Sequence, residues 1–383
     1  MSPRGYDGRE QGMIAGIHRL TAMTTLSTML SGQGFGSSSK SPGTGMAKAT
    51  IQDVARLAGV SIKTVSRVTN REANVREETR RKVQRVVDKL DYRPNPSARR
   101  LAGTRSYLVG LLFDHHSAGY LSKILTGALR ASRVEGYDLV IHPCSYEDPG
   151  LVASISSLIG SMSLDGLILT PPLSDMAPLI QALDEHGVPF ALIAPADRSN
   201  EHRSIFTNDE EACADMTRYL FSLGHRRIGF VVGHPEHRAV GNRYVGYKKG
   251  LKSCGLKLDR KLVMRGDNSF ESGEKCGRRL LDLDVPPTAI FASNDNMAAG
   301  IIRVAHDMAL DIPGDLSVAG FDDIPLASRI WPSLTTIRQP IEEMAVRGTA
   351  LLLRQLRGLD DSDIGSTVES TVVLRETTGP AAD

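Results

Sequence analysis

The sequence has few features of metal-binding, disulfide-linked or membrane-spanning proteins. It holds four cysteines, Cys144, Cys213, Cys254 and Cys276, and no CxxC pair. This spacing argues against a zinc site or a disulfide framework and predicts reduced thiols in a cytoplasmic protein. No apolar run approaches the roughly 18 residues that a transmembrane helix needs. We therefore expect no metal, no membrane partner and a chain that works in the cytoplasm.

Catalytic signatures are also missing. The sequence contains no GxSxG, HExxH or P-loop motif. Asp322 and Asp323 are paired carboxylates only in sequence, and His115 and His116 have no further ligand at metal spacing, so polar lining of a pocket is the simpler interpretation. The sequence predicts no enzymatic activity, no catalytic residue and no cofactor.

The net charge of +2 hides a strong segregation of charge. Residues 1–45 carry +2, residues 46–106 carry +9 and residues 107–383 carry −9. A small basic segment attached to a larger acidic body indicates that the small part meets a polyanion, and nucleic acid is the leading partner. The first 45 residues are rich in Gly, Ser and Thr, so we expect a disordered stretch or a mis-annotated leader before Met46.

The basic segment has the pattern of short helices joined by a tight turn. Thr50 and Asp53 form a capping-box sequence, and Gly59 suits the left-handed residue that ends a first helix. Ser61 is placed to cap a second helix through Thr69. A third helix is expected at about 77–90, with Val83, Val86, Val87 and Leu90 on its apolar face. This order predicts a helix-turn-helix domain over 46–94, with the second helix in the major groove.

A long ungapped run carries a specific resemblance. Residues 51–70, Thr79-Arg80 and the stretch 90–102 closely resemble the headpiece of the LacI/GalR family of bacterial repressors. The resemblance implies that Ile62, Lys63 and Arg67 read base edges, and Arg67 can donate two bonds to guanine, worth about 1–3 kcal/mol. Residues assigned to phosphate or supporting contacts are Thr50, Thr64, Ser66, Asn70 and Thr79.

The segment 95–106 is expected to behave as a hinge. It is too short to be helical alone, since isolated helices below about 12 residues are marginal in water. The resemblance implies that it becomes helical on DNA and inserts Leu101 into the minor groove, beside Arg99 and Arg100. The alternative is a disordered linker with an incidental leucine. Arg76 stands where many relatives have a capping serine, so the headpiece is expected to be marginal without DNA.

The acidic body predicts an α/β fold with parallel sheets. Short apolar runs alternate with longer amphipathic stretches, a pattern typical of strands covered by helices on both faces. The runs divide into two sheets separated near 204–208, and ligands of such folds bind beyond the carboxyl ends of the strands. The predicted strands are 107–113, 137–142, 166–170, 190–194, 227–233, 262–265, 289–293 and 317–320.

The body also resembles the LacI/GalR core, which is itself like periplasmic sugar-binding proteins. The matching motifs are 223–228, Arg243 with Gly246-Tyr247, 291–298, 320–323 and 332–340. The resemblance implies a two-lobed effector-binding and dimerisation core over 107–383. We expect lobe 1 to comprise about 107–205 plus 321–337, and lobe 2 about 206–320 plus 338–378.

Several residues of this core are candidates for effector binding. Asp295 holds the family position of a carboxylate that accepts hydroxyl hydrogens, and Arg243 the position of a guanidinium that grips the ligand. Tyr120 can stack on a sugar ring, although it can also merely cap the lobe. The remaining candidates are Asn208, Asn268 and Phe270, while Trp331 is expected to pack in the core.

These patterns favour a homodimeric DNA-binding repressor. Its partners are a near-palindromic double-stranded DNA operator and a small-molecule effector, a sugar, that changes operator affinity through lobe closure and hinge folding. The tail after Leu356 lacks the apolar heptads of a coiled-coil tetramer. The alternatives are a sugar-binding transport protein without a DNA role and an architectural DNA protein without an effector. Induction and corepression both remain open.

Overall fold

The computed structural model describes residues 49–69, 75–92, 105–114, 117–360 and 364–382. The candidates Asn70, Arg99, Arg100, Leu101 and the His115-His116 pair lie outside these ranges, as do the leader and nearly all of the hinge. Among the described residues no helix is long and apolar enough to cross a membrane.

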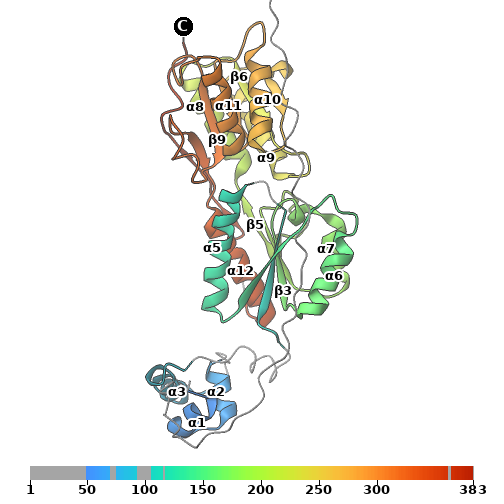
Figure 1. Ribbon diagram of the computed structural model, residues 1–383, viewed down its shortest axis with the longest axis vertical. Coiled ribbons are helices and arrows are strands. Elements are labelled where there is room, and N and C mark those ends of the chain that lie inside the picture. The colour runs from blue at the N-terminus through green and yellow to red at the C-terminus, as the bar shows by residue number, and fades with distance from the viewer. Residues whose placement is uncertain (1–48, 70–74, 93–104, 115–116, 361–363, 383) are drawn as a thin grey trace, which may run out of the picture. The chain divides into compact units, whose positions relative to one another are not determined.

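The basic segment forms α1 (Ile51–Ala58), α2 (Ile62–Thr69) and α3 (Glu77–Lys89) (Figure 1). The Thr50 side chain accepts from the Asp53 amide at 3.3 Å, and the Asp53 carboxylate accepts from the Thr50 amide at 3.1 Å, so the predicted capping box is present. Gly59 has φ +61°, which allows the chain to leave α1 sharply. The three helices enclose a small core of Val54, Ala55, Ala58, Val65, Val68, Val83 and Tyr92.

The start of α3 has the weakness that the sequence predicts. Arg76 is its N-cap residue and makes no side-chain capping hydrogen bond. Glu77 and Glu78 in the first turn interact favourably with the helix dipole and partly offset the missing cap.

The first lobe is a parallel sheet with the strand order β11-β5-β4-β3-β1-β2. Helices α5 (Ala118–Val134) and α12 (Ile341–Arg357) pack together on one face, and α6 (Leu151–Met162) and α7 (Ala177–Glu185) cover the other (Figure 1). The strands are β1 (Leu108–Phe113), β2 (Asp138–Pro143), β3 (Gly166–Leu169), β4 (Phe190–Ile193), β5 (Ser204–Thr207) and β11 (Thr367–Val368).

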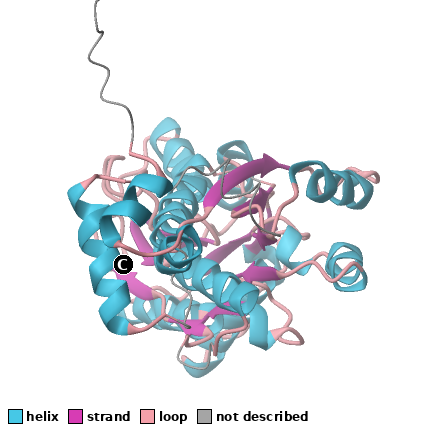
Figure 2. Ribbon diagram, turned by 90° about the horizontal axis from the view of Figure 1, so that it is seen from below, coloured by secondary structure: helices cyan, strands magenta, loops and turns pink. Residues whose placement is uncertain are grey.

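The second lobe repeats this plan with the order β12-β10-β9-β8-β6-β7. One face carries α8 (Asp209–Ser222) and α9 (Ala239–Ser253), and the other carries α10 (Phe270–Leu281) and α11 (Asp295–Asp307). Only β12 runs antiparallel to its neighbour within the described part of this sheet. The strands are β6 (Ile228–Val232), β7 (Val263–Arg265), β8 (Ala289–Ala292), β9 (Ser317–Asp322), β10 (Thr335–Arg338) and β12 (Thr371–Val373). In Figure 2 the strands lie between layers of helices.

The predicted α/β fold is confirmed, but the later lobe boundaries are wrong. Each predicted strand is present within a few residues, whereas β5, β10, β11 and β12 are not predicted. Because β10 pairs with β9 and β12, residues 321–337 belong to the second lobe and not the first. Helix α12 packs on α5, β3 and β4, which places most of 338–378 with the first lobe.

Within the described residues, three segments cross between the lobes. They join β5 to α8, β10 to α12, and β11 to β12. The third lies between the other two, since Val368 pairs with Thr207 in the first lobe and Thr371 pairs with Arg338 in the second. The Asn208 side chain accepts a hydrogen bond of 2.7 Å from the Ser370 amide, which ties the first crossing to the third.

Trp331 does not pack in the core as expected. Its side chain is 78% exposed, next to the Trp331-Pro332 peptide between β9 and β10. The motif that follows it does contribute to the core, because Leu334 and Ile337 are fully buried.

Candidate ligand-binding cleft and nucleic-acid interface

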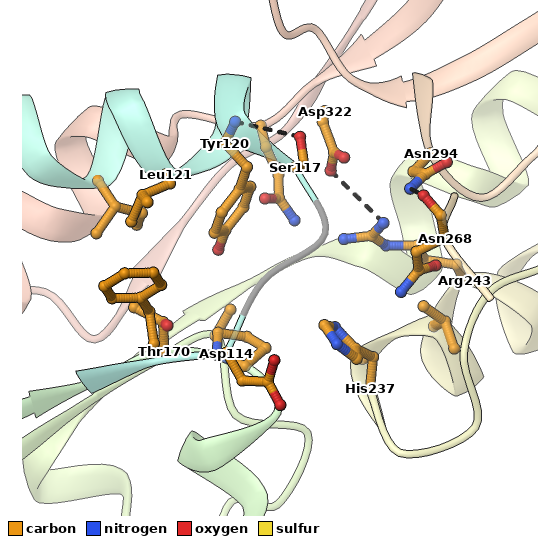
Figure 3. Close-up of a pocket in the computed structure, with 17 residues that line it drawn as sticks. Asp114, Ser117, Tyr120, Leu121, Thr170, His237, Arg243, Asn268, Asn294 and Asp322 are labelled. Carbon is orange, nitrogen blue, oxygen red and sulfur yellow. Dashed lines mark hydrogen bonds and ion pairs between the residues drawn. The ribbon is translucent and has the colours of Figure 1, made fainter. Parts of the chain in front are cut away.

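A cavity lies between the two lobes, beyond the carboxyl ends of strands from both sheets (Figure 3). Its volume is about 730 Å³, including the part open to solvent. Such a position, at the edge where parallel strands end, is where doubly wound folds bind small molecules. Its lining residues are Phe113, Asp114, Ser117, Tyr120, Leu121, Ile124, Thr170, Pro171, Ala194, His237, Ala239, Val240, Arg243, Asn268, Asn294, Asp322 and Gln339.

Arg243 on α9 is the buried cation of this cavity. Its Nε donates to Asp209 Oδ2 at 2.9 Å, and Nη1 donates to the Ser293 carbonyl at 2.6 Å. Nη1 also lies 3.5 Å from Asp322 Oδ1, and the guanidinium stacks over the Phe321 ring at 3.7 Å. These contacts hold the Arg243 side chain, which was predicted to bind a ligand, in one orientation. The two carboxylates also balance its positive charge.

Asp322 at the end of β9 lies beside Arg243 in the lining of the cavity (Figure 3). Burial raises its pKa to about 7, with a smaller raising effect from Asp209 and lowering effects from Arg243 and Lys123. The neighbouring Asp323 turns away and accepts from Arg338 at 2.6 Å and from Arg375 at 2.5 Å. The two carboxylates that are adjacent in the sequence therefore have separate surroundings.

Asp295 is not among the residues that line the cavity. The side chain is fully buried at the start of α11, where Oδ2 accepts from the Ile324 amide at 2.8 Å and Oδ1 accepts from Thr336 Oγ1 at 2.5 Å. Burial, followed by the nearby Asp322, raises its pKa well above the usual range. In this arrangement the Asp295 carboxylate, which was predicted to meet a ligand, binds Ile324 and Thr336 of the second lobe. Asp322 is the acidic side chain of the second lobe that lines the cavity.

Two asparagines complete the wall formed by the second lobe. Asn294 Nδ2 donates to the Asn268 carbonyl at 2.9 Å, and Asn268 Oδ1 accepts from the His234 amide at 3.3 Å. Asn268 has φ +73°, a conformation that asparagine tolerates better than most residues. The predicted candidate Asn268 thus lies at the cavity, whereas Phe270 and Asn208 are not among its lining residues.

The wall formed by the first lobe is more apolar. Tyr120 lies in the first turn of α5, where its amide donates to the capping Ser117 Oγ at 3.3 Å. It lines the cavity together with Phe113 and Leu121 (Figure 3). Burial raises the pKa of the Tyr120 hydroxyl, which therefore stays protonated.

Gln339 is a lining residue that the sequence did not indicate. It lies in the second crossing segment and is 2% exposed, and its Oε1 has no hydrogen-bond partner among the described residues. A buried amide oxygen without a partner is costly, so this side chain is a strained point of the lining. The motif 332–340 resembles the LacI/GalR core, but its residue types do not show which of its side chains lines the cavity.

Contacts across the cleft join the lobes directly. The Tyr146 hydroxyl, after β2, lies 3.0 Å from His234 Nε2, after β6, and their rings meet edge to face with centroids 5.6 Å apart. Lys123 Nζ on α5 donates to the Asp323 carbonyl at 2.6 Å. Movement of one lobe relative to the other must break or rearrange these contacts.

The candidate nucleic-acid interface is the outer face of α2. Ile62 is 47% exposed and Lys63 is also exposed, while Thr64, Ser66 and Arg67 are half-buried along the same helix. Thr79 is half-buried on α3. The Thr50 hydroxyl is engaged in the capping box, where it donates to Asp53 Oδ2 at 2.7 Å.

Comparison with known proteins identifies the class. The model of the bacterial regulatory proteins of the lacI family matches residues 50–95, and that of the periplasmic binding protein-like domain matches residues 217–378. Catabolite control protein A of Priestia megaterium is 31% identical over 325 residues, 85% of this chain and 95% of that protein. The transcriptional repressor CytR of Escherichia coli K12 is 31% identical over 332 residues, 86% of this chain and 96% of the repressor.

Solved structures agree with these relatives. The lac repressor dimer bound to operator and the anti-inducer ONPF has a TM-score of 0.67 at 28% identity and covers 87% of this chain and 100% of its own. The complex of the regulator CelR with cellobiose has a TM-score of 0.66 at 28% identity and covers 86% of this chain and 99% of its own.

A helix-turn-helix headpiece joined to a two-lobed ligand-binding core defines a DNA-binding transcriptional regulator with an effector domain, and not an enzyme. The chain belongs to the LacI family of bacterial regulatory proteins. The alternative of a transport protein without a DNA role is not favoured.

Proposed function

We propose that the protein is a homodimeric, sequence-specific repressor in the cytoplasm that binds a near-palindromic operator and changes its operator affinity when a neutral sugar binds between the lobes. The lac repressor dimer with its operator and the CelR complex with cellobiose are similar structures that support this proposal. We also propose the boundaries 46–94 for the headpiece and 95–106 for the hinge.

The charges around the cavity favour a neutral ligand over a phosphorylated one. Arg243 is the buried cation, and the carboxylates of Asp209 and Asp322 already neutralise it. Asp114 adds a further acidic side chain to the lining. A phosphate group would meet this excess of negative charge, and the described lining residues offer no further buried cation to pair with it. The proposal therefore rests on one observation, that Arg243 is already paired with Asp209 and Asp322.

The polar atoms that face the cavity suit a polyhydroxylated molecule. The carboxylate of Asp322 and the side-chain amide of Asn294 can hydrogen-bond hydroxyl groups, and the ring of Tyr120 can present a face to the C–H side of a sugar. Hydrogen bonds at one wall and an apolar ring at the other are the usual equipment of a small-molecule site.

The assignment of residues to DNA contacts rests on the family and on exposure. Ile62 and Lys63 project from α2, and Arg67 lies one to two turns further along the same helix. We propose that these side chains read base edges and that Thr64, Ser66, Asn70 and Thr79 hold the phosphate backbone. Arg99, Arg100 and Leu101 are proposed for the minor groove.

The proposal is tested by footprinting the purified protein on DNA upstream of its own and neighbouring genes, titrated with neutral sugars and the matching sugar phosphates. We expect a protected site with two-fold symmetry and a response to a neutral sugar. Arg67→Ala is expected to relax base preference at one position by about 1–3 kcal/mol. Arg81→Ala, on the exposed face of α3, is the matched control and is expected to keep the preference.

Two outcomes contradict this proposal. Equal affinity for matched and scrambled duplexes at every salt concentration excludes sequence-specific binding, because phosphate contacts alone give that result. A response confined to sugar phosphates excludes the charge argument while leaving the DNA-binding assignment intact.

A further inference from the structure

The chain passes from the hinge into the first lobe at Arg105, Ser106 and Tyr107, the hinge exit, which is attached to two layers of that lobe. Arg105 Nη2 donates to the Leu356 carbonyl in the last turn of α12, which belongs to the helix layer. The Asp165 carboxylate, directly before β3, accepts from the Ser106 amide and from the Tyr107 amide, both at 2.9 Å. The hinge exit therefore spans the boundary between the helices and the sheet.

The contact between Arg105 and α12 has an electrostatic basis. The last four carbonyl groups of an α-helix have no partner within the helix and carry the negative end of its dipole. Leu356 is the next-to-last residue of α12, and Arg105 brings a positive charge and a donor to its carbonyl oxygen. Arg105 is also half-buried, so solvent screens this contact less than it screens a surface ion pair.

The opposite end of α12 borders the cavity between the lobes. Gln339, a lining residue of that cavity, is 2% exposed and lies two residues before Ile341, where α12 begins. The helix has 17 residues, which gives a length of about 25 Å at about 1.5 Å per residue. One uninterrupted helix thus leads from the cavity to the carbonyl group that binds Arg105.

Helix α12 contacts α5, which lies beside it in Figure 1, more rigidly than it contacts the sheet. A Cβ atom on Gly127 of α5 would lie 2.3 Å from the Glu342 carbonyl oxygen, so the two backbones touch. A Cβ atom on Gly348 of α12 would instead meet Cδ1 of Ile193 in β4, at 2.4 Å, which is the movable end of a side chain. Small shifts of packed helices therefore take α5 and α12 together, as one layer sliding on the sheet.

We propose that Arg105 is a positioning residue that couples the hinge to the α5–α12 layer and so to the effector cavity, an inference that rests on the proposed function. A shift of the layer moves Leu356 relative to Asp165, because Leu356 belongs to the layer and Asp165 to the sheet. Arg105 follows Leu356, whereas Ser106 and Tyr107 stay with Asp165. The direction in which the chain leaves the lobe toward the DNA-binding headpiece changes as a result.

Hydrogen exchange of the full chain, followed by mass spectrometry, tests this coupling without DNA or a sugar. The amides of Ser106 and Tyr107 report on the hinge exit, since both are hydrogen-bonded to Asp165. Gln339→Ala removes a buried side chain at the cavity end of α12, and we expect it to accelerate their exchange at least threefold. In a chain that also carries Arg105→Met, we expect the same substitution to change the exchange less than twofold.

Further variants separate this coupling from a general loss of stability. Arg105→Lys keeps a positive charge near the end of α12 and is expected to restore at least half of the response to Gln339→Ala. Arg347→Met removes an arginine of α12 that binds Glu343 on the same helix, and is expected to leave the response unchanged. Should Gln339→Ala fail to fold, Ile341→Val deletes one buried methyl group at the first residue of α12 and serves as the milder perturbation.

The proposal is overturned if Gln339→Ala leaves the exchange of Ser106 and Tyr107 unchanged, since α12 then transmits nothing to the hinge exit. It is also overturned if Gln339→Ala accelerates this exchange equally with and without Arg105→Met, because Asp165 alone would then hold the exit. Loss of the response in Arg347→Met has the same meaning. These measurements use neither an operator nor an effector, so their failure leaves the repressor proposal untouched, and a failed footprint does not change their outcome.

Discussion

The two walls of the cavity between the lobes, our proposed effector site, differ in how they are built. The second lobe supplies Arg243 and Asp322 in a buried network of charges, with Asn268 and Asn294 hydrogen-bonded to each other beside it. The first lobe supplies the ring of Tyr120 among apolar neighbours. The difference suggests that one wall fixes the orientation of a ligand through polar contacts, while the other contributes contact area and moves with its lobe.

The largest expected effect comes from breaking the charged wall. Arg243→Ala leaves Asp209 and Asp322 buried without their cation, so we expect the free energy of unfolding to fall by about 3–5 kcal/mol, measured by urea denaturation. Arg303→Ala removes an exposed partner of Asp307 in the same lobe and is expected to cost at most about 1 kcal/mol. Equal losses in the two variants would show that the Arg243 network contributes no more than a surface pair.

The next effect is a pH dependence that belongs to the same wall. In the folded chain the pKa of Asp322 is about 7, above its ordinary value of 3.8. Between about pH 4 and pH 7, Asp322 is therefore protonated in the folded chain and ionised in the unfolded chain. Stability contributed by this proton is present at low pH and is lost as pH rises to about 7, with a slope of at most about 1.4 kcal/mol per pH unit.

Asp322→Asn is expected to reduce this slope in urea denaturation at pH 5, 6, 7 and 8. The slope does not vanish, because burial also raises the pKa of Asp295 and acts with the same sign. An unchanged slope in the variant would mean that the ionisation of Asp322 is not penalised by the fold.

The apolar wall is tested by the ring of Tyr120. Tyr120→Ala is expected to weaken binding of the effector sugar about tenfold, or about 1.4 kcal/mol, by titration calorimetry. Tyr120→Phe keeps the ring and is expected to retain affinity within twofold. A similar loss in both variants would assign the contribution to the hydroxyl and refute stacking.

The smallest expected effect concerns the contact between Tyr146 and His234, which joins the two lobes. Tyr146→Phe removes the hydrogen bond to His234 across the cleft, worth about 0.5–1 kcal/mol, and is expected to lower sugar affinity two- to fivefold. Tyr219→Phe removes a tyrosine hydroxyl contact to Thr378 within one lobe and is expected to leave the affinity unchanged. If the two variants behave alike, the Tyr146 contact does not favour the closed arrangement.

The sequence was a good guide wherever a segment is apolar or carries a cap. Runs such as 289–293 are apolar throughout, as expected for a strand that is buried on both faces of a sheet. The strands that were not predicted are two to four residues long and rich in threonine, such as Thr335–Arg338 and Thr371–Val373, so their pairing depends on neighbours distant in the sequence. The error in the lobe boundaries follows directly, because β10 determines where the chain crosses.

The sequence predicted only part of the candidate site, because some of its side chains are oriented by contacts with distant segments. Tyr120, Arg243 and Asn268 follow strands or begin helices at the cleft, and the structure places them there. Asp295 closely follows β8 and Asp322 is the last residue of β9, and residue type does not show which carboxylate faces the cavity. The choice depends on Thr336 and Ile324, which bind Asp295 from segments far along the chain.

The three crossing segments restrict the ways in which this repressor can respond. A single tether would let one lobe rotate in any direction relative to the other, whereas three adjacent tethers share one bending axis. Gln339 lies on the middle of one tether, and Asn208 fastens the other two to each other. A molecule that contacts Gln339 therefore touches one of the segments that join the two lobes.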